Sequence, residues 1–97
     1  MEATFTARVW RHEGEAAWYF LTLPARVADE IEDLPTPGRG FGSRRVEISI
    51  GTTTWRTSVF PSTEHRSFVL PVKKAVRSAE GIADDARVRV TLRLLDD

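Results

Sequence analysis

The 97-residue sequence predicts a mainly β domain in which two related halves, each with one short helix, close a barrel. Apolar and polar residues alternate over several segments, as they do in strands that face a core on one side. The dipeptide Leu-Pro, followed by a helical pattern, occurs twice, at Leu23-Pro24 and at Leu70-Pro71. Each half reads strand, strand, helix, strand, and alone it would expose the apolar side of its sheet. Two such halves, about 1–50 and 51–97, can cover each other and remove free strand edges.

The first half is predicted to begin with a hairpin of two strands, residues 3–11 and 16–23, around a turn that contains Gly14. The second strand is apolar on both faces, so we expect it to be central and covered on both sides. Pro24 then opens a helix over 25–34, because proline lacks an amide hydrogen and fits the first helical turn. The apolar stripe of this helix is Val27, Ile31 and Leu34. The inward residues of a following strand at 45–50 are Val46, Ile48 and Ile50.

The second half is predicted to repeat this order, with strands at 54–60, 66–70 and 87–94. Pro71 ends the middle strand and opens a helix with one apolar stripe. The residues of that stripe are Val72, Ala75, Val76 and Ala79. Gly81 is expected to stop the helix in a left-handed conformation, which glycine adopts without a steric penalty. The inward residues of the last strand are Val88, Val90, Leu92 and Leu94.

Length and composition indicate one globular domain over residues 1–97, large enough for a modest core. The chain has no cysteine, which excludes disulfides and thiolate chemistry. The N-terminus has no apolar signal core, and no apolar run approaches the ~20 residues of a membrane span. We therefore expect a cytoplasmic protein that does not associate with membranes.

Charge is balanced over the chain, with 14 basic and 14 acidic residues, but it is not evenly distributed. Residues 38–77 carry eight basic residues against Glu47 and Glu64, and three of the eight lie at the start of the second predicted helix. Basic groups beside free helix amides form a candidate site for an anion or a protein partner. The residues of this candidate face are Lys73, Lys74, Arg77, Arg44, Arg45, Arg56 and Arg66. The alternative is a solvated basic surface whose cations pair with carboxylates such as Glu64 or Glu80.

Several segments resemble a bacterial domain family of unknown function, DUF1905. They are Gly40–Ser43, Trp55–Pro61 and Val69–Arg77, and the resemblance covers nearly the whole chain. It implies a double-split β-barrel, formed as a single-chain duplication of what swapped-hairpin transcription factors of the AbrB and MazE type build as dimers. Asp84-Asp85 stands where the AbrB half usually has Gly-Asp, so the turn before the last strand differs. The resemblance assigns no functional residue. Because the dimeric relatives bind DNA, the resemblance implies duplex DNA as an alternative ligand for the basic face.

Two further features each have a structural and a functional interpretation. The glycine-rich segment 38–42 follows a helix and enters a strand, the reverse of a phosphate-binding loop, so a crossover between half-barrels is the simpler interpretation. The aromatic residues could line a ligand-binding barrel mouth or belong to the core. They are Trp10, Trp18, Tyr19, Trp55 and Phe60, and Trp10 is expected to be exposed.

The sequence presents no catalytic constellation and no metal site. His12 and His65 lie in predicted turns or loops, and the serines lack the context of a nucleophile elbow. We therefore expect a non-enzymatic binding module that uses no cofactor and binds a protein or an anionic ligand, as a monomer or weak homodimer. The remaining alternative is an enzyme that uses the barrel mouth and His65.

Overall fold

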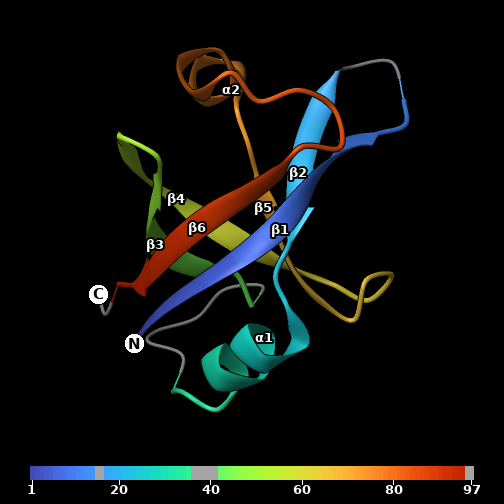
Figure 1. Cartoon of the computed structure of the whole chain (residues 1–97). Coiled ribbons are helices and arrows are strands. Elements are labelled where there is room, and N and C mark those ends of the chain that lie inside the picture. The colour runs from blue at the N-terminus through green and yellow to red at the C-terminus, as the bar shows by residue number, and fades with distance from the viewer. Residues whose placement is uncertain (15–16, 36–41, 96–97) are drawn as a thin grey trace.

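The structure is a computed structural model, and it describes residues 1–14, 17–35 and 42–95. These residues form six strands and two helices, arranged around a closed barrel (Figure 1). In chain order the elements are β1 Glu2–His12, β2 Trp18–Thr22, α1 Ala25–Glu32, β3 Arg44–Ile50, β4 Thr53–Ser62, β5 Ser67–Pro71, α2 Lys74–Glu80 and β6 Arg87–Leu94. Among the described residues, neither helix is long and apolar enough to cross a bilayer. Most of the glycine-rich segment 38–42 lies outside the described residues.

The barrel closes in the order β1-β2-β5-β4-β3-β6, and every neighbouring pair is antiparallel. β1 is long enough to pair with two strands, with β6 through residues 2–8 and with β2 through residues 9–12. The mainly β barrel with two helices is therefore confirmed. Exchanging β1, β2 and β3 with β4, β5 and β6 leaves the pairing order unchanged. The duplication itself and the relationship to AbrB and MazE stay predictions.

The core consists of inward residues of the strands together with residues of the two helices, such as Ile31 of α1 and Val76 of α2. In β1 the inward residues are Phe5, Ala7 and Val9, and in β3 they are Val46, Ile48 and Ile50. In β6, Val90, Leu92 and Leu94 are buried, and Val88 packs partly buried against the same core. Each strand directs its other residues into solvent, because successive side chains point to opposite faces.

The two helices lie at opposite ends of the barrel (Figure 1). α1 begins directly after Pro24, as predicted, and buries Val27, Ala28 and Ile31. It ends at Glu32 rather than at Leu34, and Leu34 lies half-buried beyond it. α1 therefore closes one end of the barrel, while α2 lies over the other.

α2 differs from the prediction at its start and in its apolar stripe. Pro71 is the last residue of β5, where it pairs with Phe20, and the helix begins three residues later. The amide of Val72 still donates to the Tyr19 carbonyl at 2.8 Å, which keeps the chain extended past the proline. The predicted stripe is wrong at Ala75 and Ala79, which are exposed, because a two-turn helix contacts the barrel mainly through Val76. Gly81 has φ 62° and ends the helix in the left-handed conformation, as predicted.

The prediction that the second strand is covered on both sides is wrong. Leu21 of β2 is buried inside the barrel, but Trp18 is 60% exposed and Phe20 is half-buried on the outer surface. Both helices lie at the ends of the barrel, so neither covers the outside of this sheet. β2 consequently presents aromatic side chains to solvent.

Candidate functional site

A groove of about 560 Å³ lies between β2 and α2, and we call it the β2–α2 groove. Its apolar lining comes from Trp18, Tyr19, Phe20, Pro71 and Val72, and its basic lining from Lys73, Lys74 and Arg77. An apolar recess with a few convergent polar groups is the usual form of a ligand site. The groove thus joins part of the predicted basic face to part of the predicted aromatic set.

Strand pairing and one arginine hold the groove together. Phe20 of β2 lies opposite Pro71 of β5, so both strands contribute to the same surface. Arg77 donates from Nη1 to the carbonyl of Val72 at 2.9 Å, and its guanidinium carbon lies 3.9 Å from the centre of the Tyr19 ring. Arg77 is therefore fixed in place before any ligand arrives.

The two lysines of the groove are exposed, and no ion pair involves them among the described residues. Lys73 is the residue before the helix rather than part of its first turn. Glu80, one of the carboxylates considered as their partner, instead accepts hydrogen bonds from the hydroxyls of Thr52 and Thr53. Within the part of the chain that the structure describes, no carboxylate therefore neutralises the charge of these lysines.

Arg44 does not line this groove, and it is buried, with 5% of its surface exposed. Its guanidinium donates to the carbonyls of Ile31 and Pro35 at 3.0 Å each and to that of Leu34 at 3.4 Å. Ile31 lies in the last turn of α1, and Leu34 and Pro35 follow the end of the helix. Backbone carbonyls at a helix C-terminus lack the amide donors of a following turn. Arg44 is a buried cap of α1 and does not contribute to an exposed basic face.

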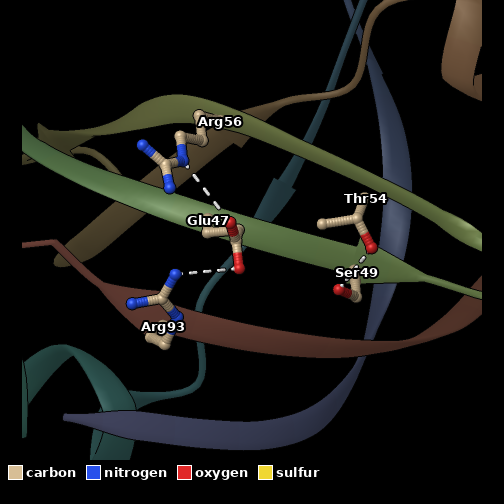
Figure 2. A network of polar contacts seen from close by, with 5 residues as sticks. All are labelled: Glu47, Ser49, Thr54, Arg56 and Arg93. Carbon is tan, nitrogen blue, oxygen red and sulfur yellow. Dashed lines mark hydrogen bonds and ion pairs between the residues drawn. The ribbon is translucent and has the colours of Figure 1, made fainter.

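Arg45, Arg56 and Arg66 also do not line the groove. Figure 2 shows Glu47 of β3 between Arg56 of β4 and Arg93 of β6, with N–O distances of 3.4 and 3.0 Å. Arg45 lies on β3 and donates to Ser58 at 3.5 Å. Arg66 occupies the turn between β4 and β5, with φ 53°. Of the seven predicted basic residues, the structure brings Lys73, Lys74 and Arg77 together.

The outer surface of β1 and β2 carries a row of four rings, which we call the aromatic row: Trp18, Phe20, Trp10 and His65. Successive ring centres are separated by 6.2, 5.2 and 4.8 Å. Trp10 is half-buried rather than fully exposed, because its ring stacks on His65 and its Nε1 donates to Thr22 at 3.0 Å. His65 is held in turn by Ser62, whose Oγ lies 3.1 Å from Nδ1.

Sequence reasoning missed Phe20 and His65 as members of this surface. The alternation Trp18, Phe20, Thr22 already placed Phe20 on the face opposite Leu21. No local pattern places His65, since it comes from the β4–β5 turn and reaches Trp10 only when the barrel closes. Of the other aromatic candidates, Trp55 packs partly buried against the core and Phe60 is 45% exposed on β4.

A second recess, of about 370 Å³, lies at the other end of the aromatic row, and we call it the Trp10–His65 recess. Its charged lining is Arg8, Arg11, Asp84 and Asp85. Arg8 pairs with Asp85. Asp84 raises the pKa of the Tyr19 hydroxyl above its ordinary 10.0, chiefly through a side-chain hydrogen bond, and desolvation adds to the effect. Among the described residues, no group of three metal-binding side chains gathers anywhere.

Comparison with known proteins identifies the family. The sequence profile described as "Domain of unknown function (DUF1905)" matches residues 5–92, which is most of the chain. A search of curated proteins gave no match. The chain, a small β-barrel with two helices, therefore belongs to the DUF1905 family of domains of unknown function.

Proposed function

We propose that this domain is a binding module whose β2–α2 groove holds a ligand with a planar apolar part and a negatively charged part. The observation that carries the proposal is the position of Lys73 and Lys74 beside the exposed ring of Trp18 in the same groove. Both lysines are exposed, and neither forms an ion pair with a carboxylate of the described residues. Burying apolar surface there supplies affinity, and the lysines select an anion.

Each part of the groove has a distinct role in this proposal. Trp18 and Phe20 offer ring faces for stacking, and Val72 and Pro71 form the apolar surface beneath. Arg77 is already oriented by the Val72 carbonyl and the Tyr19 ring, so little side-chain entropy is lost when it contacts an anion. In this proposal the side chains of the groove bind the ligand, and the free backbone amides at the start of the seven-residue helix α2 do not.

Duplex DNA fits this surface less well than such a ligand. Neutralising a duplex requires several convergent cations along the phosphate backbone. Arg44 is buried, Arg56 pairs with Glu47, and neither lines the groove. Three cations around an apolar groove suit a compact anion attached to a ring.

The test is a titration of ¹⁵N-labelled protein followed by two-dimensional NMR, with phenyl phosphate as the probe. Inorganic phosphate supplies the anion without the ring, and benzyl alcohol supplies the ring without the anion. We expect saturable shifts at Trp18, Tyr19 and Lys74 with phenyl phosphate, and weaker ones with either fragment.

The variant Lys74→Glu is expected to weaken binding of phenyl phosphate, because it replaces an attractive charge with a repulsive one. Arg89→Glu is the matched control, since Arg89 is exposed on β6 and does not line the groove. Absence of saturable shifts, or equal affinity in Lys74→Glu and the wild type, would show that the groove is not an anion site.

A further inference from the structure

The β2–α2 groove and the Trp10–His65 recess are two ends of one surface. Trp18 and Phe20 line the groove, and Trp10 and His65 line the recess. The aromatic row connects them, with ring centres no more than 6.2 Å apart at each step. A small ligand in the groove would leave the other half of this row uncovered, whereas a chain-like ligand with repeated planar groups could cover all of it.

We propose that this outer face of β1 and β2 binds single-stranded nucleic acid, with bases stacked along the aromatic row and phosphates beside Lys73 and Lys74. The inference rests on the proposed function, because the groove is one end of the binding surface. It goes further by naming the ligand class and by including Trp10 and His65.

The chemistry of the row favours exposed bases. Every base has a π-face, so aromatic side chains bind single strands with little dependence on sequence. In a duplex the base faces are stacked on one another, and side chains reach mainly base edges and phosphates. Rings that project from the outside of a barrel therefore match a single strand better than a duplex.

Charge also favours nucleic acid over a neutral chain such as an oligosaccharide. Among the described residues, three cations and no carboxylate line the groove, so the charge of this lining is positive. In the recess, Arg8 and Arg11 face Asp84 and Asp85, and these charges balance. We therefore place the phosphate contacts at the groove end and stacking alone at the recess end.

The experiment is fluorescence anisotropy with a labelled oligothymidylate of roughly eight nucleotides, within the range that one small barrel domain covers. The comparison ligands are a blunt duplex of equal length and unlabelled maltoheptaose as a competitor. We expect the single strand to bind more tightly than the duplex and the sugar not to compete. With two lysines in contact, the slope of log affinity against log salt should be roughly −1.4.

Two variants examine the two ends of the row. Trp18→Ala and His65→Ala should each weaken oligothymidylate binding about tenfold, the loss expected for one stacked base. His65→Phe keeps a ring beside Trp10 and should retain most of the affinity. Thermal unfolding by circular dichroism checks that each variant is folded, and Arg89→Glu again serves as the charge control.

The outcomes separate this inference from the proposed function. If phenyl phosphate binds but oligothymidylate does not, or if His65→Ala binds as tightly as the wild type, the nucleic-acid inference is wrong and the groove proposal stands. If neither probe binds, both are wrong. Equal affinity for the duplex, or competition by maltoheptaose, also overturns the inference.

Discussion

The guanidinium of Arg77 lies over the ring of Tyr19, with 3.9 Å between its carbon and the ring centre. This cation–π contact joins α2 to β2 across the β2–α2 groove. Asp84, from the turn before β6, raises the pKa of the hydroxyl of the same tyrosine. Two segments far apart in the sequence, β2 and α2, thus meet at one ring that lines the groove.

Replacing Asp84 with asparagine should lower the pKa of Tyr19 toward 10.0. The carboxylate raises this pKa in the folded protein, because a neutral phenol donates to it and a phenolate is repelled by it. A raised pKa stabilises the fold below the unfolded value and loses that effect as pH rises through the folded value. Ultraviolet titration of the phenolate measures the pKa directly. An unchanged pKa in Asp84→Asn would contradict the contact, and Asp85→Asn is the control.

Arg44→Met should destabilise the domain by about 2–3 kcal/mol, the range for losing charge-assisted hydrogen bonds. The substitution removes the guanidinium from the carbonyls of Ile31 and Pro35, and the Ile31 carbonyl then keeps the hydrogen bond from the Leu34 amide. Urea unfolding followed by circular dichroism gives the free energy of unfolding. The neighbouring Arg45→Met should change it by less than about 0.5 kcal/mol, because Arg45 is exposed. Equal losses in the two variants would argue against the capping role.

Gly51→Ala should be more destabilising than Gly81→Ala, although both glycines are left-handed, with φ 59° and 62°. Each substitution carries the left-handed penalty of about 1–2 kcal/mol. An added Cβ at Gly51 would also overlap the Glu80 carboxylate, whereas nothing lies within 4 Å at Gly81. Displacing Glu80 from Thr52 and Thr53 should add about 1 kcal/mol.

The background Glu80→Ala provides the control for this pair. Removing the carboxylate removes the overlap, so the two alanine substitutions should then lower the free energy of unfolding equally. If Gly51→Ala remains more destabilising than Gly81→Ala in the Glu80→Ala background, the overlap with the Glu80 carboxylate is not the cause of the difference.

Glu47→Gln should reduce the acid sensitivity of the domain. The hydrogen bond from Arg93 is the main cause of the lowered pKa of Glu47; desolvation opposes it, and Arg56 lowers the pKa further by smaller contributions. A lowered pKa stabilises the fold above the unfolded value, ordinarily 4.5, and this effect is lost as pH falls through the folded value. Melting temperatures measured between about pH 6 and pH 3 should therefore fall less steeply in Glu47→Gln than in the wild type. Parallel curves would show that the pair is too well solvated to matter, and Glu2→Gln is the control.

The strand faces and one end of each helix could be predicted from local sequence. Alternation in residues 87–94 and 45–50 correctly predicted which side chains enter the core, because a strand has only two faces. Pro24 and Gly81 correctly marked one helix start and one helix end, since both act through their own backbone preferences.

The candidate site was predicted only in part. Lys73, Lys74 and Arg77 are close in sequence and remain close in space, so their grouping could be inferred. The alternation that places Val46 and Ile48 inward also places Arg44 on the inward face of β3 and Arg45 on the outward face. The contact of Arg44 with the end of α1 could not be predicted, because no local pattern gives the position of that helix relative to β3. His65 was assigned to a loop, and nothing in its surroundings indicates the stacking on Trp10.

The sequence by itself determined the strands, the positions of Pro24 and Gly81 and the inward faces of β1, β3 and β6, because these follow from side-chain alternation and backbone preferences within a few residues. Closure of the barrel decided which surfaces meet. It left the outside of β2 uncovered, buried Arg44, and placed α2 against Tyr19. Such contacts depend on residues tens of positions apart, whose relative placement is set by strand register and not by any local preference.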